Sequence, residues 1–212
     1  MSKKIVSVIL ARGGSKGIPR KNIIDLGGKP LIQWTINSSL MSNVDETWVS
    51  TDNQKIAEIA KKANSKVLHR PPTLATDTSS SEDALLHFAE NVDFDILVFI
   101  QPTSPLLTPL DINQGLYMMD KYDSVFSAYE EHWVPKWTKN YIPYNFVKHH
   151  RPRRQDKEPL YVENGAFYIT TKENLLKSKL RYSGFIGIVE MPLWRSFQVD
   201  TFDDLDLLNK LI

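Results

Sequence analysis

Residues Ile5–Leu10 (IVSVIL), followed directly by Ala11–Asn22 (ARGGSKGIPRKN), decide the fold of this chain. The apolar run predicts a buried strand, so the loop after it leaves the carboxyl end of that strand. The three glycines of the loop let the backbone approach a ligand closely, although their spacing fits neither the P-loop nor the dinucleotide fingerprint. Amide groups and cations around one loop can bind a polyphosphate, and we predict this role for Arg12, Lys16, Arg20 and Lys21. An ordinary glycine-rich turn with solvated charges is the alternative.

The composition is that of an ordinary soluble globular protein, with 212 residues, of which 42% are hydrophobic and 24% charged. A net charge of +1 gives no global electrostatic case for nucleic-acid binding, and no apolar run approaches the roughly 20 residues that span a bilayer. The start of the chain lacks the apolar region of a signal peptide. Because the chain has no cysteine, disulfides and thiolate chemistry are excluded. We expect a cytoplasmic enzyme with no nucleic-acid or membrane partner.

Short apolar runs alternate with helical patterns, which predicts an α/β, Rossmann-like domain over residues 1–212 with a mainly parallel central sheet flanked by helices. The expected strands are residues 5–10, 46–50, 66–69, 96–100, 123–129, 165–170 and 185–190. The expected helices are residues 30–40, 54–63, 79–90, 110–122 and 202–211, with Asn53 as the N-cap of the second. Residues 130–163 show no clear periodicity, and we interpret them as an insert that is functional or contacts a partner.

Polar sequences follow two further expected strands, at the sheet edge where open α/β folds bind their ligands. The first, Gln101–Leu106 (QPTSPL), contains two prolines that rigidify the turn and hold the glutamine and the hydroxyls in place. The second, Ser50–Asp52, is explained equally well as a simple helix cap. The insert carries a basic cluster, Arg151–Arg154, whose guanidinium groups suit a carboxylate. A solvated or nucleic-acid-binding loop is the alternative interpretation of that cluster.

Together these sequences resemble the CMP-sialic acid synthetases, the cytidylyltransferases that activate sialic acids. Four boxes carry the resemblance, which extends over residues 5 to about 208: Ala11–Asn22, Gln101–Leu106, Arg151–Asp156 and Tyr161–Tyr168. The resemblance implies that CTP and a nine-carbon 2-keto-3-deoxy sugar acid give the CMP-sugar acid and pyrophosphate. Pseudaminic, legionaminic and Kdo-type acids are alternative acceptors. It also implies that the insert is a small dimerisation lobe, so that a homodimer completes each site across its interface.

The resemblance further implies roles for individual residues. Catalytic roles fall to Arg12, Lys21 and Asp200. The implied nucleotide-binding residues are Ala11, Arg12, Gly13, Ser15, Lys16, Asn22, Arg70, Ser79 and Ser81. The implied sugar-acid-binding residues are Gln101, Thr103, Ser104, Lys136, Arg154, Asn164, Tyr168 and Tyr182.

Asp200 is also the expected ligand of Mg²⁺ (or Mn²⁺). Most members of the family have two aspartates, one residue apart on a strand, and side chains at such positions project from the same face and can hold one hard cation. This chain has Gln198 in place of the first aspartate, which removes one negative charge. Asp203 and Asp204 could compensate, but they fit better as first-turn residues of the last helix. A non-catalytic nucleotide-binding paralogue is therefore the alternative from a different functional class.

Overall fold

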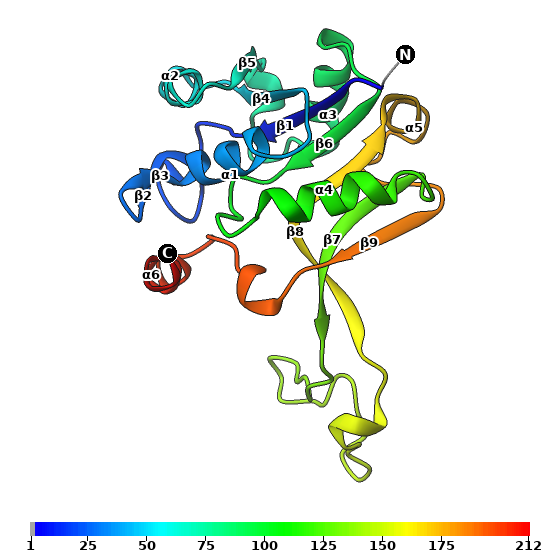
Figure 1. The fold of residues 1–212 in the computed structure, drawn as a ribbon. Coiled ribbons are helices and arrows are strands. Elements are labelled where there is room, and N and C mark those ends of the chain that lie inside the picture. The colour runs from blue at the N-terminus through cyan, green and yellow to red at the C-terminus, as the bar shows by residue number, and fades with distance from the viewer. Residues whose placement is uncertain (1–2) are drawn as a thin grey trace.

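Seven strands form one sheet in a computed structural model that describes residues 3–212 (Figure 1). The strands along the sheet are, in order, β5 (Lys66–His69), β4 (Glu46–Thr51), β1 (Ile5–Leu10), β6 (Ile96–Ile100), β8 (Leu160–Thr171), β7 (Ser124–Glu131) and β9 (Ile186–Glu190). The pairs β5–β4, β4–β1, β1–β6 and β7–β9 are parallel, whereas β8 runs antiparallel to both of its neighbours. The expected fold class, a mainly parallel sheet, is confirmed.

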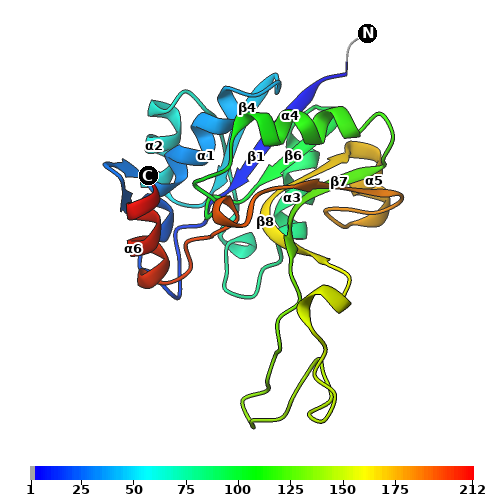
Figure 2. The ribbon, with the colours of Figure 1, turned by 60° about the horizontal axis from the view of Figure 1, so that its bottom comes forward.

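Helices cover both faces of the sheet and bury a core on each side (Figure 2). One face packs against α1 (Leu31–Leu40), α2 (Gln54–Lys62) and α4 (Pro109–Met118), and the other against α3 (Ser81–Asn91) and α5 (Lys172–Ser178). The alternation of side chains along β1 produces this division. Val6 and Val8 pack with Phe88 of α3, while Ile9 packs on the opposite side with Ile36 of α1. Helix α6 (Phe202–Leu211) closes a smaller third cluster near the C-terminus.

Small elements complete the body of the protein. A two-stranded hairpin of β2 (Asp25–Leu26) and β3 (Lys29–Pro30) lies between the glycine loop and α1. Short 3₁₀ turns are formed by Lys21–Ile23, Pro72–Leu74, Arg154–Asp156 and Leu193–Arg195. Among residues 3–212, no helix combines the length and the apolar character that crossing a membrane requires.

The structure corrects three expectations from the sequence. The helix expected over residues 110–122 ends at Met118, and α5, which was not predicted, is a seven-residue helix that Thr171 caps by accepting a hydrogen bond from the amide of Asn174. Residues 198–200 do not lie on a strand, so the prediction that Gln198 and Asp200 share a strand face is wrong. The reason is local, because β9 ends before Pro192 and a 3₁₀ turn carries the chain out of the sheet.

The insert begins and ends in a ribbon. Strands β7 and β8 stay paired beyond the sheet, from Ala128 opposite Glu163 to Glu131 opposite Leu160, so both ends of the expected insert are regular strand. Residues 132–159 between them form one 3₁₀ turn and two isolated bridges. In both views this segment projects away from the sheet and its helices (Figures 1 and 2). The expected dimerisation role of the segment stays a prediction.

Candidate active site

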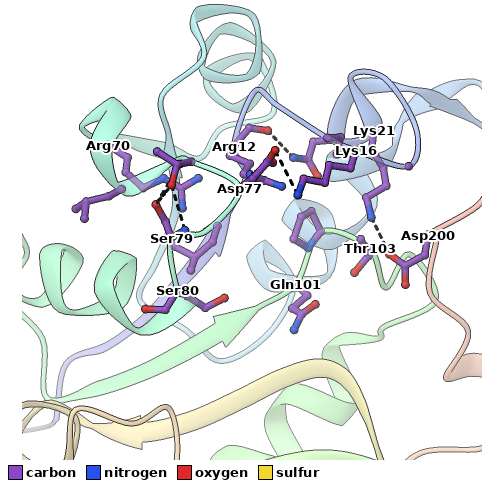
Figure 3. A pocket seen from close by; sticks show the side chains of 18 of the residues that line it. Arg12, Lys16, Lys21, Arg70, Asp77, Ser79, Ser80, Gln101, Thr103 and Asp200 are labelled. Carbon is purple, nitrogen blue, oxygen red and sulfur yellow. Dashed lines mark hydrogen bonds and ion pairs between the residues drawn. The ribbon is translucent and has the colours of Figure 1, made fainter.

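A cavity of about 420 Å³ lies at the carboxyl ends of β1 and β6 (Figure 3). Four segments far apart in the sequence surround it: the glycine loop, residues 70–81, the turn after β6 and the residue before the cap of α6. It is lined by all three predicted catalytic residues, most of the predicted nucleotide-binding residues and two of the eight predicted sugar-binding residues: Arg12, Ser15, Lys16, Lys21, Asn22, Arg70, Ser79, Ser81, Gln101, Thr103 and Asp200. Strand order thus brings these residues together as the sheet-edge argument predicts.

Hydrogen bonds from neighbouring elements hold the glycine loop in place. The amide of Ala11 donates to the carbonyl of Ser50 at 3.0 Å, and the amide of Gly13 donates to Oδ1 of Asp52 at 2.8 Å. Neither Ala11 nor Gly13 lines the cavity. Asn22, which is buried, donates from Nδ2 to the carbonyl of Arg12 at 2.9 Å. Asn22 therefore supports the loop backbone, and Asp52 has a positioning role that the sequence alone did not reveal.

Gly17 has a steric reason to be glycine. A Cβ atom at this position would lie 2.7 Å from the carbonyl oxygen of Asp200, closer than real side chains approach. The loop therefore packs directly against the segment that carries Asp200. This close approach joins the two ends of the chain at the edge of the cavity.

Carboxylates pair with three of the cations in the cavity (Figure 3). Nη1 of Arg12 donates to Oδ1 of Asp77 at 2.7 Å, and Nζ of Lys16 lies 3.6 Å from Oδ2 of the same carboxylate. Nζ of Lys21 donates to Oδ1 of Asp200 at 2.8 Å. The hydrogen bond from Arg12 is the main cause that lowers the pKa of Asp77. Asp77 is a site residue that sequence reasoning missed, because its partner Arg12 is 65 residues away.

Arg70 lies on the wall of the cavity with only 5% of its surface exposed. Its Nε and Nη2 atoms have no hydrogen-bond partner among the described residues, and burial lowers the pKa of its guanidinium. A buried donor without an acceptor costs about 1–3 kcal/mol. Acceptor atoms of a bound ligand would remove this cost, so Arg70 is the side chain of the cavity that most directly indicates a ligand.

The serines near Arg70 are used in different ways. The hydroxyl of Ser79 donates to the carbonyl of Thr73 at 3.0 Å and is thus part of a local turn. The hydroxyl of Ser80 accepts from the amide of Asp83 at 3.0 Å and caps α3. Ser81 also lines the cavity. Of the two serines expected to bind nucleotide, Ser79 is therefore held by its own turn.

The predicted sugar-binding aromatic residues form a stacked wall beside the cavity. The ring of Tyr168 stacks on Phe99, a cavity-lining residue, at 5.6 Å and on Tyr182 at 5.9 Å. The hydroxyls of both tyrosines donate to the carboxylate of Glu163, at 3.1 Å and 3.0 Å. Burial is the main cause that raises the pKa of Tyr168 to about 12. The two hydroxyls are therefore committed to Glu163, another residue that the sequence did not single out.

An ion pair beneath this wall fixes it to α3. Nε and Nη2 of Arg181 donate to the two carboxylate oxygens of Glu82 at 2.6 Å and 3.0 Å. The guanidinium carbon of Arg181 lies 5.1 Å from the ring centre of Tyr168 and 5.6 Å from that of Phe99. Neither residue of the pair was predicted, because they are 99 residues apart and no local pattern marks them.

Asn164 and Gln198 belong to the scaffold behind the cavity. Asn164 is buried, accepts from the hydroxyl of Ser127 at 2.6 Å and donates to Oγ of Ser196 at 3.0 Å. The side-chain amide of Gln198 donates to the carbonyl of Asn164, while its Oε1 accepts from the hydroxyl of Thr103 at 3.3 Å. Ser104 is also buried and does not line the cavity. Gln198 therefore links the side chain of Thr103 to the backbone of Asn164.

Asp200, the predicted metal ligand, is one of two carboxylates that line the cavity, the other being Asp77. It lines the cavity with about two thirds of its side chain exposed. Within residues 3–212 no group of three or more His, Cys, Asp or Glu side chains could hold a metal ion by itself. Asp203 and Asp204 lie in the first turn of α6, where the Asp204 carboxylate accepts from the amide and hydroxyl of Thr201 at 2.7 Å and 2.8 Å.

The predicted residues of the insert lie outside this cavity. Lys136 donates from Nζ to Oε2 of Glu131 at 3.0 Å. Arg154 lines a separate cavity of about 420 Å³ together with His132 and Trp133. Sequence reasoning placed Lys136 and Arg154 with the sugar acid, and this chain by itself does not bring them to Gln101 or Thr103.

Fold and site together define the class of the protein. A Rossmann-like sheet whose first strand leads into a basic glycine loop at the carboxyl edge is typical of proteins that bind nucleotides. The family is shown by comparison with known proteins, because the cytidylyltransferase family model matches residues 6–204. The chain belongs to the cytidylyltransferase family.

Individual relatives agree with this assignment. The chain is 39% identical over 210 residues to N-acylneuraminate cytidylyltransferase B of Danio rerio and 35% identical over 212 residues to the N-acylneuraminate cytidylyltransferase of Streptococcus agalactiae. These matches cover 94% and 95% of the chain but 49% and 51% of the relatives, so the chain spans about half the length of the curated relatives it matches. The family resemblance inferred from the sequence boxes is confirmed.

A solved structure confirms the fold independently. The structure of CMP:2-keto-3-deoxy-manno-octonic acid synthetase complexed with CTP superimposes with a TM-score of 0.75 and covers 98% of each chain. Its sequence is 22% identical to this chain. At this identity the likeness shows a shared architecture, and the substrates must be argued from the site.

Proposed function

We propose that the chain is a CTP-dependent cytidylyltransferase that activates a nine-carbon 2-keto-3-deoxy sugar acid of the sialic acid type. The observation that carries the proposal is the grouping of Arg12, Lys16 and Lys21 with the buried, unpartnered Arg70 around one cavity. Such a site suits a nucleoside triphosphate, because it offers several cations to the phosphates and a separate planar donor to the base. The names of the relatives supply the substrate class.

The reaction is a nucleotidyl transfer. The oxygen of the anomeric C2 hydroxyl attacks the α-phosphorus of CTP in line and its proton passes to solvent. The bond from that phosphorus to the bridging oxygen breaks, and pyrophosphate leaves with the bonding electrons. Phosphoryl chemistry of this kind depends on positioning and charge neutralisation rather than on covalent help from the protein. Arg12, Lys16 and Lys21 would neutralise the charge that develops on the leaving pyrophosphate.

The nucleotide base has a matching wall. A cytosine edge offers acceptors at O2 and N3, and the Nε and Nη2 groups of Arg70 are donors that need acceptors. Ser81, at the start of α3, also lines this side of the cavity. We therefore assign the base to the Arg70 side of the cavity and the phosphates to the glycine loop.

Mg²⁺ (or Mn²⁺) fits the donors present. Mg²⁺ in nucleotide enzymes is usually held by one or two carboxylates together with substrate phosphates, and Asp200 supplies one exposed carboxylate beside the phosphate-binding cations. When bound, the ion would add positive charge at the phosphates. The chain's own part is to present the Asp200 carboxylate, which Lys21 holds at 2.8 Å.

The sugar acid would lie on the side of Gln101, Thr103 and the aromatic wall. Lys136 and Arg154 cannot serve the cavity of their own chain without a large movement, because they lie on the projecting insert. We propose that two chains form a homodimer in which each insert reaches the other chain's cavity and brings the Arg154 guanidinium to the C1 carboxylate. A cytoplasmic location would suit a chain without cysteine.

The direct test measures pyrophosphate release from CTP and Mg²⁺ with a panel of sialic, legionaminic, pseudaminic and Kdo acids. Release with a nine-carbon acid would support the proposal and identify the acceptor. Release with Kdo alone would assign the eight-carbon acceptor. The N-acylneuraminate relatives favour the sialic acid arm.

A non-catalytic nucleotide-binding protein is the second candidate, and Gln198 favours it. This residue occupies the position of an expected metal-binding carboxylate but is bonded to Thr103 and Asn164. Binding of CTP without pyrophosphate release, even at high Mg²⁺ concentration and with every acid of the panel, would support this candidate.

A further inference from the structure

The carboxylate of Asp77 lies in the phosphate-binding part of the cavity, on a segment that is distant in sequence from the glycine loop. It contacts Arg12 at 2.7 Å and Lys16 at 3.6 Å with its two oxygens (Figure 3). Two oxygens on one tetrahedral phosphorus would engage the same two cations in a similar way. In the structure, therefore, a side chain of the protein makes the contacts that a phosphate group of the nucleotide is expected to make.

Asp77 is carried by a small turn that holds itself together. The hydroxyl of Ser79 donates to the carbonyl of Thr73 at 3.0 Å, and the amide of Thr76 donates to the hydroxyl of Ser79 at 3.1 Å. These bonds lie within the turn, whereas the two ion pairs of Asp77 connect the turn to the glycine loop. The side chain of Asp77 is about half exposed. It can therefore leave the cations without breaking the hydrogen bonds of its own turn.

Electrostatics explains why a carboxylate stands here. Arg12, Lys16, Lys21 and Arg70 repel one another when no anion lies between them. Asp77 pairs with the first two and Asp200 with the third. A triphosphate brings about four negative charges to the same cations, and the carboxylate of Asp77 then competes with it for Arg12 and Lys16.

We propose that Asp77 is an internal competitor of the phosphates, occupying Arg12 and Lys16 in the empty site and yielding them to the triphosphate. This inference rests on the proposed function, because it assigns the phosphates to the glycine loop. As pyrophosphate leaves, the carboxylate takes back the two cations and thereby accelerates release of the product. Asp77 therefore lowers the affinity for phosphate groups and raises the rate at which pyrophosphate leaves the site.

The test compares Asp77→Asn and Asp77→Glu with wild type by calorimetric titration of Mg²⁺-pyrophosphate into the full chain. Asp77→Asn removes the charge and should bind pyrophosphate about three- to tenfold more tightly, as expected for the loss of two partly exposed ion pairs. Stopped-flow measurements should show that the higher affinity of Asp77→Asn comes from slower dissociation of pyrophosphate. Asp77→Glu keeps the charge and should stay within about twofold of wild type.

Two controls make the outcome decisive. Asp93→Asn removes a charge next to the amino end of β6, 95% exposed and remote from the cavity, and should leave pyrophosphate binding unchanged. Thermal unfolding should show that Asp77→Asn stays folded. Weaker or unchanged pyrophosphate binding by Asp77→Asn would overturn the proposal. If Asp77 only positioned Arg12 for the phosphates, its loss would weaken binding, and if it did not compete with them, its loss would leave binding unchanged.

The proposed function can fail separately. Lys21→Ala should weaken pyrophosphate binding regardless of the role of Asp77. If wild type binds pyrophosphate and Lys21→Ala binds it less tightly, the assignment of the phosphates to the glycine loop stands. It stands even if Asp77→Asn fails to bind pyrophosphate more tightly. A wild type that binds neither pyrophosphate nor CTP would contradict both proposals together.

Discussion

The glycine loop and the insert both carry clusters of cations, but those of the loop lie in a cavity of the body and those of the insert lie on a projecting segment. Arg12 and Lys21 lie in a cavity of the body, each bound to a carboxylate at 2.7–2.8 Å. Arg151 of the insert is exposed, Arg153 donates to both carboxylate oxygens of Asp156 on the surface of the insert, at 2.9 and 2.8 Å, and Arg154 lines a cavity within the insert. The cations of the loop thus gather around one cavity of the body, where strand ends fix the backbone, whereas those of the insert lie on a projecting segment.

The apolar residues of the insert point to the same conclusion. Trp137, Tyr141 and Tyr144 are 54%, 88% and 75% exposed, although large aromatic side chains are usually covered. In the body, Phe88 and Phe167 are fully buried, whereas Tyr117, Phe185 and Phe202 on its surface are also more than half exposed. Exposed aromatic and basic side chains lie together on the projecting segment, and the homodimer proposed above would cover them with a second copy of the chain.

The largest effect on activity is expected from Lys21, whose side chain is less exposed than those of Arg12 and Lys16. Lys21→Ala should lower the rate of pyrophosphate release by about 10²–10³-fold, the usual loss when one preorganised charge at a developing anion is removed. The fold should survive, because Lys21 donates to the exposed carboxylate of Asp200 and not to the core. Steady-state kinetics and thermal unfolding would check both points.

Lys62→Ala, on the exposed surface of α2, is the matched control and should keep wild-type kinetics. If Lys21→Ala kept the wild-type rate, the position of this cation in the cavity would have no consequence for activity. The phosphate assignment would then be wrong even if the cavity geometry were correct.

The second prediction concerns the insert. Arg154→Ala should lower kcat/KM for the sugar acid about 10- to 100-fold through loss of a charge-assisted hydrogen bond, while the affinity for CTP stays unchanged. The loop variant should instead affect the phosphates. Separate titrations with CTP and with the acid, each by calorimetry, would show whether the two regions divide the substrates in this way.

Mixing the two variants tests whether the site crosses between chains. In a homodimer with shared sites, a hybrid of Lys21→Ala and Arg154→Ala chains has one intact site, so random reassortment should restore about a quarter of the wild-type activity. Recovery that does not exceed the activity of the separate variants would show that each chain completes its own site. The projecting insert would then need another explanation.

Local patterns predicted most of the fold. The apolar run Ile5–Leu10 and the cap at Asn53 are contained in neighbouring residues, and the structure confirms both, with Asn53 accepting from the amides of Lys55 and Ile56. The loop cations were found because glycines and charges follow a strand directly. Such features depend on interactions over a few residues, which a sequence displays without its fold.

The remaining features depend on distant pairs. Asp77 meets Arg12 across 65 residues and Glu82 meets Arg181 across 99, and neither carboxylate stands out in its own segment. The expected strand at Gln198 is an exception with a local cause, because β9 ends before Pro192 and a 3₁₀ turn carries the chain out of the sheet. Antiparallel β8 also follows from tertiary packing and not from a local pattern.

A third prediction concerns Gln198, which lies two residues before the cavity-lining Asp200. Gln198→Asp adds a carboxylate near Asp200 and should tighten the binding of free Mn²⁺ about three- to tenfold in the absence of nucleotide, since hard cations bind more strongly as charged oxygens are added. The variant loses the bond from Gln198 to the carbonyl of Asn164, so Tm should fall by about 2–4 °C. Electron paramagnetic resonance of free Mn²⁺ measures the first effect. Unchanged Mn²⁺ affinity would show that position 198 is purely structural.

The smallest effect on activity is expected from the ion pair of Glu82 and Arg181, which lies in the body but outside the glycine loop. Glu82→Gln should lower stability by about 1 kcal/mol, which corresponds to about 2–4 °C in Tm, and should leave kcat within about threefold of wild type. Glu90→Gln, exposed on the same helix, is the control. A loss of activity as large as that of Lys21→Ala would erase the distinction between charges that hold the fold and charges that bind substrate.

The pH dependence of this variant gives an independent check. The hydrogen bond from Arg181 is the main cause that lowers the pKa of Glu82 below its ordinary value of 4.5. A carboxyl whose pKa is lower in the folded state adds stability above its unfolded pKa and loses that contribution as the pH falls through the folded pKa. The Tm difference between wild type and Glu82→Gln should therefore be constant from about pH 6 to 8 and shrink below about pH 4. A difference that persists undiminished in acid would mean that the pair acts through packing on Tyr168 and Phe99, not through its charge.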